Sequence, residues 1–242
     1  MAREVASEVA RVAVARDLPF VFKASVDKAN RTSGDSWRGP GWERGLDWLA
    51  RLGADLGVRV ITDVHEPDQA ASAARAVDAL QIPAFLCRQT DLLRAAAATG
   101  LPVNLKKGQF LAPWQVGPAA DKLDGASEIW ITERGTSFGH GDLVVDFRSV
   151  VALRETGRPL LFDASHAAQT PGGAGSASSG DRRWIPVLAR AAGAAGYDGL
   201  YLEVHPDPPS ARSDRDTQWP LDDVGRLLDA FLAARAARLA SE

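Results

Sequence analysis

Short apolar segments alternate with segments of helical periodicity along the whole chain. The apolar segments are continuous and rich in Val, Ile, Leu and Phe, which is typical of strands buried on both faces. A strand followed by a helix, seven times, predicts a parallel sheet built by right-handed crossovers. The predicted strands cover residues 18–25, 58–64, 79–84, 102–107, 128–134, 159–165 and 199–205. The predicted helices cover residues 41–56, 67–77, 90–99, 113–124, 143–156, 182–195 and 221–238, after a first helix near the amino terminus.

Two α/β architectures accommodate this alternation, an open doubly wound sheet and a (β/α)8 barrel. Nearly every predicted strand carries a charged or amide residue near its carboxyl end. An open sheet concentrates its polar side chains at one switch point, whereas a barrel gathers the carboxyl ends of all its strands around one mouth. We therefore predict a single barrel domain over residues 1–242. The strand-end residues are Lys23, Asp63, Gln81, Lys106, Arg134, His166 and Glu203.

The charge balance and the cysteine content limit the kinds of partner and compartment. A total of 28 basic residues against 31 acidic residues gives a formal net charge of −3, which argues against a nucleic-acid surface or a polybasic membrane contact. The single cysteine, Cys87, favours a reducing compartment, and no apolar run approaches the roughly 18 residues of a membrane span. The sequence predicts a cytoplasmic protein that binds neither nucleic acid nor membranes.

Six basic residues lie at or after the predicted strand ends, although the chain is acidic overall. A phosphate group accepts two or three charge-assisted hydrogen bonds, preferably from arginine in a bidentate arrangement. Six cations around one mouth therefore suit a ligand set with two phosphates and one carboxylate. These residues are Lys23, Lys28, Arg31, Arg88, Lys106 and Arg134.

Long motifs in the same order resemble the 3-deoxy-D-manno-octulosonate 8-phosphate synthase family over nearly the whole chain. They include "FKASVDKANRTS", "VNLKKGQFLAPW", "ITERGTSFG", "FDASHAAQTPGG" and "EVHPDP". The resemblance implies a barrel enzyme that condenses phosphoenolpyruvate with arabinose 5-phosphate and releases phosphate. Its product is a precursor of a lipopolysaccharide sugar. The resemblance also implies a homotetramer and no organic cofactor.

The resemblance assigns roles to individual positions. Asp63 would bind a sugar hydroxyl, and Gln81 and Gln109 would support the same pocket. The residues expected to act in catalysis are Lys28, Asp63 and His166. The residues expected to hold phosphoenolpyruvate are Lys23, Arg88, Lys106 and Arg134. The residues expected to hold arabinose 5-phosphate are Lys28, Asn30, Arg31 and Thr32.

One branch of the resembled family uses a divalent metal, and the other uses none. In the metal-dependent branch, His166, Glu203 and Asp214 would be three ligands of Mn, Co, Zn or Fe, and a cysteine on the first strand would be the fourth. The metal-free branch has an asparagine at that cysteine's position. The stretches "FLCRQTD", "LAPW", "QTPGG" and "TQWPL" favour the metal-dependent branch. Cys87 is not the family's metal cysteine, because it follows a different strand.

Two alternatives to this function stay open. The sister enzyme 3-deoxy-D-arabino-heptulosonate 7-phosphate synthase uses erythrose 4-phosphate, but its sugar loop resembles "KPRTS", whereas this chain has "KANRTS". The second alternative is a truncated, non-catalytic barrel that binds phosphosugars. It is motivated by the seven predicted strands and by the absence of the family's first strand with its "GPC"-like stretch. We expect on this ground that Met1 is not the true start.

Overall fold

The computed structural model describes residues 1–30, 34–171 and 179–241. A seven-stranded parallel sheet lies at its centre, and its strands follow the order of the sequence. In this part of the chain, β1 and β11 are the outer strands of that sheet. The seven strands are β1 (Val21–Lys23), β2 (Arg59–Asp63), β3 (Ala79–Ile82), β4 (Val103–Lys106), β5 (Ile129–Glu133), β8 (Leu160–Asp163) and β11 (Gly199–Tyr201).

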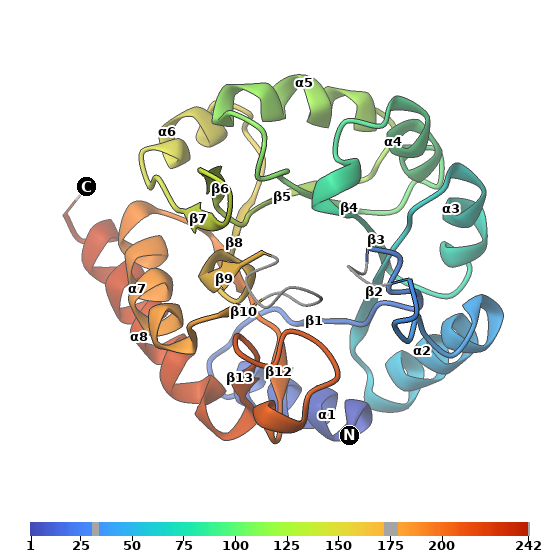
Figure 1. Ribbon diagram of the computed structural model, residues 1–242, viewed down its shortest axis with the longest axis horizontal. Helices are drawn as coiled ribbons and strands as arrows, with labels where there is room; N and C mark the ends of the chain where they lie inside the picture. The colour runs from blue at the N-terminus through green and yellow to red at the C-terminus, as the bar shows by residue number, and fades with distance from the viewer. Residues whose placement is uncertain (31–33, 172–178, 242) are drawn as a thin grey trace.

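Helices surround the outside of the curled sheet, as the end-on view in Figure 1 shows. The predicted architecture, a parallel (β/α)8-type barrel sheet with helices around it, is therefore confirmed. The helices are α1 (Ala2–Val14), α2 (Trp42–Leu56), α3 (Pro67–Ala73), α4 (Thr90–Ala97), α5 (Val116–Ala120), α6 (Ser149–Arg154), α7 (Ile185–Ala195) and α8 (Val224–Leu239). Short 3-10 helices are η1 (Ala84–Leu86), η2 (Pro113–Gln115), η3 (Asp121–Leu123), η4 (His166–Ala168), η5 (Arg182–Trp184), η6 (Pro208–Ser210) and η7 (Leu221–Asp223).

The sequence of α2 shows why each helix covers the sheet. Leu46, Leu49 and Leu52 recur at intervals of three residues and are all buried, so one face of the helix packs on the core. The helix ends at Gly57, whose φ of 63° lies in the left-handed region that glycine adopts without strain. At the amino terminus, α1 is tied to α8 by Arg16, which donates two hydrogen bonds to the carboxylate of Asp229.

Residues of β4 alternate between the two faces of the sheet and are all buried. Val103 and Leu105 belong to the apolar core, whereas Asn104 donates a hydrogen bond to Thr132 Oγ1 of β5 (2.8 Å). Alternation places Lys106 on the same face as Asn104. The strand register thereby directs Lys106 toward the barrel interior at the carboxyl end of β4.

Several predicted boundaries differ from the structure, and three of these differences add a short ribbon after a barrel strand. The predicted strand 199–205 ends at Tyr201, and β12 (Val204–His205) pairs instead with β13 (Trp219–Pro220). The predicted helix 143–156 begins only at Ser149. Its first residues belong to β7 (Asp142–Val144), which forms a hairpin with β6 (Thr136–Phe138). The predicted helix 182–195 starts with a 3-10 turn, after β10 (Ser179–Gly180) has paired with β9 (Gln169–Thr170).

Among the described helices, none combines the length and apolar composition that crossing a bilayer requires.

Candidate active site

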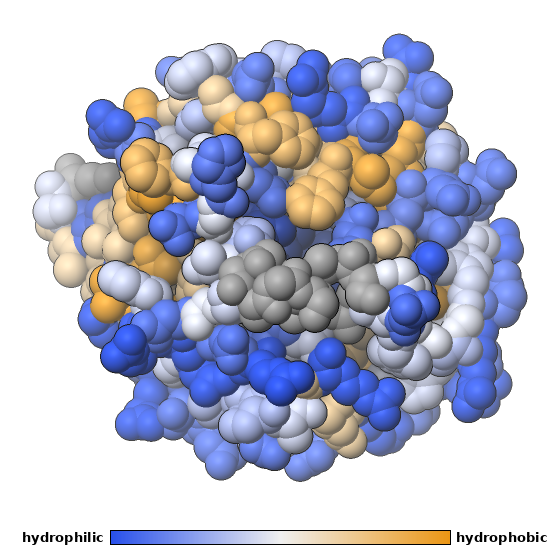
Figure 2. Space-filling view, viewed as in Figure 1, coloured by the Kyte–Doolittle hydropathy of each residue, from blue (hydrophilic) through white to orange (hydrophobic). Residues whose placement is uncertain are grey.

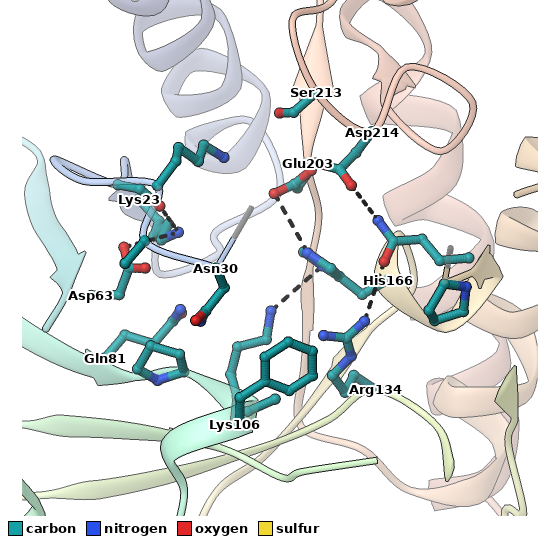
Figure 3. A pocket seen from close by; sticks show the side chains of 18 of the residues that line it. Lys23, Asn30, Asp63, Gln81, Lys106, Arg134, His166, Glu203, Ser213 and Asp214 are labelled. Atoms are coloured by element: carbon teal, nitrogen blue, oxygen red, sulfur yellow. Dashed lines mark hydrogen bonds and ion pairs between the residues drawn. The ribbon is translucent and has the colours of Figure 1, made fainter. Parts of the chain in front are cut away.

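A pocket of about 590 Å³ lies at the carboxyl ends of the parallel strands, as predicted for a barrel. Its volume is in the range typical of small-molecule sites. Figure 3 shows its side chains converging from opposite walls, with Lys23 and Asp63 facing His166 and Glu203. The predicted site residues that line it are Lys23, Lys28, Asn30, Asp63, Gln81, Lys106, Gln109, Arg134, His166, Glu203 and Asp214.

Among the described residues, Arg88 is the one predicted site residue that does not line this pocket. Arg88 is exposed and follows η1, whose residues Ala84 and Phe85 do line the pocket. Arg31 and Thr32 lie outside the described residues. Two further cations line the pocket without having been predicted, Arg212 and Arg215 in the segment after β12.

Lys23 and Asp63 form an ion pair on one wall of the pocket, with Nζ 3.3 Å from Oδ1. Lys23 also donates a hydrogen bond to Ser25 Oγ (2.6 Å), and His65 Nε2 lies 3.3 Å from Asp63 Oδ2. Burial alone raises the pKa of the Asp63 carboxyl, but the charge of Lys23 and the contacts of His65 more than offset it, so this pKa lies well below its usual range. Asp63 is therefore an ionised acceptor at neutral pH.

Asp163 connects two predicted site residues on the opposite wall. This fully buried carboxylate places Oδ2 2.5 Å from Lys106 Nζ and 2.7 Å from His166 Nδ1. Burial acts to raise the pKa of Asp163, yet the charges of His166 and Lys106 bring it well below the usual range. The same carboxylate accepts a hydrogen bond from the backbone N–H of His166 (2.9 Å). Asp163 thus fixes the positions of both side chains.

Tyr201, at the end of β11, also contacts Lys106. The ammonium of Lys106 lies 4.1 Å from the centre of the Tyr201 ring, within the range of a cation–π interaction. Burial lowers the pKa of Lys106, whereas the Asp163 charge raises it. Sequence reasoning assigned no role to Asp163 or Tyr201. Asp163 ends β8 as Asp63 ends β2, and that shared position was the available signal.

His166 and Glu203 lie side by side at the far wall, with Nε2 3.7 Å from Oε1 (Figure 3). Gln218 donates a hydrogen bond to Glu203 Oε2 (2.9 Å), which orients the carboxylate. Burial acts to raise the pKa of Glu203, but the nearby charges of His166 and Lys28 outweigh burial, so this pKa lies below its ordinary value. Glu203 is consequently an anion facing the pocket.

Arg134 is held by a chain of hydrogen bonds that reaches Asp214. Its Nη2 donates to Gln169 Oε1 (3.2 Å), and Gln169 Nε2 donates to Asp214 Oδ1 (2.6 Å). Asp214 adopts a φ of 53°, a left-handed conformation that aspartate tolerates better than most residues. Burial lowers the pKa of Arg134, and neighbouring acids, Asp163 first among them, oppose this change.

Several buried polar atoms of the pocket have no hydrogen-bond partner among the described residues. They include Gln81 Oε1, Gln109 Oε1 and Arg134 Nε. A buried polar group without a partner costs free energy, so such atoms are usually satisfied in folded proteins. Arg134 Nε is a donor that an anionic oxygen of a ligand would satisfy, whereas the two glutamine oxygens need a donor such as a hydroxyl group. The pocket therefore suits a ligand set that carries both anionic oxygens and hydroxyl groups.

The three predicted metal ligands have donor atoms that suit a divalent transition metal, one imidazole nitrogen and two carboxylates. Because Nδ1 of His166 faces the Asp163 carboxylate, a neutral imidazole carries its proton there and directs the Nε2 lone pair toward Glu203. In the part of the chain that the structure describes, no group of three His, Cys, Asp or Glu is gathered to hold an ion. Asp214 instead accepts a hydrogen bond from Gln169 Nε2 at Oδ1 (2.6 Å).

Comparisons with known proteins agree with the motifs. The model of the DAHP synthetase I family matches residues 1–232. The 2-dehydro-3-deoxyphosphooctonate aldolase of Nitratidesulfovibrio vulgaris is 56% identical over 235 residues, covering 96% of this chain and 86% of that protein. The proteins of the same name from Aromatoleum aromaticum and a Synechococcus species are each 53% identical. They cover 94% and 97% of this chain, and each match spans 83% of the relative.

Proposed function

We propose that this chain, which belongs to the DAHP synthetase I family, condenses phosphoenolpyruvate with arabinose 5-phosphate and water. The products are 3-deoxy-D-manno-octulosonate 8-phosphate and inorganic phosphate. The enzyme is a transferase of the aldol type and supplies a precursor for lipopolysaccharide. The observation that carries this function is the pocket itself, in which six basic and four acidic side chains meet unpaired buried donors and acceptors.

The arrangement of charges divides the pocket between the two substrates. Lys106, Arg134 and Lys23, which line the pocket, bind the phosphate and carboxylate of phosphoenolpyruvate. Lys28 and Asn30, in the segment after β1, hold arabinose 5-phosphate, and the ionised Asp63 accepts a hydrogen bond from a sugar hydroxyl. Both substrates are thereby held in one cavity, which turns a bimolecular encounter into reaction between neighbours.

The chemical step joins C3 of phosphoenolpyruvate to the aldehyde carbon of the sugar while water adds to C2. The tetrahedral intermediate at C2 then expels phosphate. In this proposal Lys106 and Arg134, which line the pocket, stabilise the charge that develops on the departing phosphate. Asp163 keeps Lys106 in place throughout, because its carboxylate is fully buried.

The proposal includes a divalent transition metal bound by His166, Glu203 and Asp214. The Asp163 contact, which directs His166 Nε2 toward Glu203, supports it. Such an ion supplies Lewis-acid chemistry, either by polarising a carbonyl oxygen or by lowering the pKa of a bound water.

The proposal also includes a homotetramer in the cytoplasm. Large aromatic side chains are exposed in segments that follow β3, β4 and β5, and Figure 2 shows apolar side chains gathered over part of this face. Exposed apolar patches commonly mark contacts between protein chains. The exposed aromatic residues of these three segments are Phe85, Phe110, Trp114 and Phe138. Sedimentation of the purified protein tests the assembly state.

Phosphate release tests the catalytic proposal. We expect purified protein to release phosphate from phosphoenolpyruvate only when arabinose 5-phosphate is present. A protein that binds both compounds without turnover would instead be the non-catalytic phosphosugar-binding barrel.

A further inference from the structure

Lys107 is fully buried, although it directly follows the pocket lysine Lys106. Successive side chains of a strand point to opposite faces, so the two lysines face opposite sides of the sheet. The neighbouring strand repeats this arrangement, because Arg134 lines the pocket and Glu133 is buried behind it. Lys107 and Glu133 meet on that hidden side, with Nζ 3.3 Å from Oε1.

The ammonium of Lys107 joins two separate loops. One loop follows β4 and carries Gln109, and the other follows β5 and carries Arg134. Besides Glu133, the ammonium contacts three backbone carbonyls and one hydroxyl from these loops. The acceptors are Gly108 O, Leu111 O and Gly135 O, each at 3.3 Å, and Thr136 Oγ1 at 3.2 Å.

Glu133 extends the connection to the backbone of Arg134. Its Oε1 accepts hydrogen bonds from the N–H groups of Arg134 (2.9 Å) and Gly135 (2.6 Å). The carboxylate therefore sets the path of the chain at the residue whose side chain enters the pocket.

Stability alone is a weak explanation for this buried pair. Removing two charges from water is unfavourable, and well-packed apolar residues often stabilise a protein as well as a buried ion pair does. What apolar residues cannot supply is a set of directed contacts to three carbonyls, a hydroxyl and two N–H groups. The arrangement instead specifies where two loops stand relative to each other.

We propose that Lys107 and Glu133 are positioning residues for the phosphoenolpyruvate half of the pocket. The pair holds the β4 and β5 loops at the spacing that lets Lys106 and Arg134 bind phosphoenolpyruvate together. This inference rests on the proposed function, and neither residue touches substrate.

The test compares Lys107→Met and Glu133→Gln with the wild-type protein. We expect each variant to raise the KM and the calorimetric Kd for phosphoenolpyruvate by about ten- to a hundredfold, since small displacements of binding groups have effects of this size. The KM for arabinose 5-phosphate should change less than about threefold, because Lys28 and Asn30 lie in the segment after β1. The double variant should bind phosphoenolpyruvate only slightly more weakly than either single variant, because each single substitution already removes the Lys107–Glu133 connection.

Arg154→Met is the matched control. It removes a contact between Arg154 and Asp198 (2.8 Å) that joins α6 to the segment before β11, and Arg154 is not a pocket-lining residue. We expect it to lower the melting temperature without changing either KM. If Lys107→Met fails to fold, Thr136→Val is the substitute variant. It removes only the hydrogen bond from Lys107 Nζ to Thr136 Oγ1 (3.2 Å) and should still weaken phosphoenolpyruvate binding severalfold.

Two results overturn the proposal in different ways. Variants that melt earlier but bind phosphoenolpyruvate with wild-type affinity show that the pair is only a structural element. Wild-type protein that binds no phosphoenolpyruvate overturns the proposed function together with the inference. Hydrogen exchange at residues 107–112 and 133–138 provides a direct readout, since faster exchange in Lys107→Met is expected in these two segments and not elsewhere.

Discussion

The ammonium of Lys106 lies 2.5 Å from the buried carboxylate of Asp163. This ion pair joins the carboxyl end of β4 to that of β8, and Asp163 extends it to His166 through a 2.7 Å contact. A residue from the phosphoenolpyruvate side of the pocket is thus connected to a predicted metal ligand through one carboxylate. A change at Asp163 is expected to disturb both.

Asp163→Asn should lower kcat/KM by about a hundredfold. The substitution keeps the size of the side chain but leaves a buried ammonium without its counter-charge, and charge-assisted contacts are worth about 1.5–3 kcal/mol each. Steady-state kinetics with both substrates measure the effect. Asp142→Asn, at an exposed position outside the pocket lining, is the control and should have wild-type kinetics.

Arg134→Ala and Lys28→Ala should separate the two substrates. Arg134→Ala removes charge-assisted hydrogen bonds that each contribute about 1.5–3 kcal/mol of binding free energy. It should raise the KM for phosphoenolpyruvate by one to two orders of magnitude. Lys28→Ala should have its main effect on the KM for arabinose 5-phosphate. Equal effects of each variant on both constants would contradict the division of the pocket proposed above.

The low pKa of Asp63 predicts how stability depends on pH. Because the folded-state pKa is depressed, the unfolded chain binds more protons than the folded protein below about pH 5. The ionised Asp63 carboxylate therefore stabilises the folded protein fully above about pH 5, and this stabilisation is lost as the pH falls below that value. Urea unfolding from pH 7 to pH 3 should show a flatter profile for Asp63→Asn than for wild type. If the free energy of unfolding of Asp63→Asn fell with pH in parallel with that of wild type, Asp63 would not be the source of the pH dependence.

A chelator should abolish activity, and Mn, Co or Zn should restore part of it. His166→Gln should also lower the metal content after reconstitution, because it removes the only nitrogen ligand of the proposed set. His140→Gln, an exposed position in the β6–β7 hairpin, is the matched control and should bind metal as wild type does. Full activity after exhaustive chelation would place the chain in the metal-free branch.

The alternation of apolar strands and helices predicted the parallel sheet, and strand-end polarity predicted most of the pocket. Lys23, Lys106 and Arg134 were found because the carboxyl ends of parallel strands necessarily converge in a barrel. Arg88 was expected at the pocket because it follows a strand end, but it is exposed and outside the pocket lining, since sequence distance from a strand end does not reveal how the following turn is directed.

The partners of the pocket residues were harder to predict. Lys106 was predicted for the pocket, but Lys107 was given no role, because its burial and its contact with Glu133 depend on strand register and on how two loops pack. Asp163 likewise acquires its role only when β4 and β8 come together across the barrel. The β6–β7 ribbon was missed because residues 142–144 continue an apolar pattern that also fits a helix.

Product formation from phosphoenolpyruvate with each of two aldose phosphates tests the central claim most directly. Purified protein is supplied with arabinose 5-phosphate or erythrose 4-phosphate, and the sugar product is identified by mass spectrometry together with the phosphate released. The account predicts an eight-carbon product, 3-deoxy-D-manno-octulosonate 8-phosphate, formed stoichiometrically with phosphate, and little or no reaction with erythrose 4-phosphate. A seven-carbon product formed at the faster rate, or no product with either sugar, would contradict it.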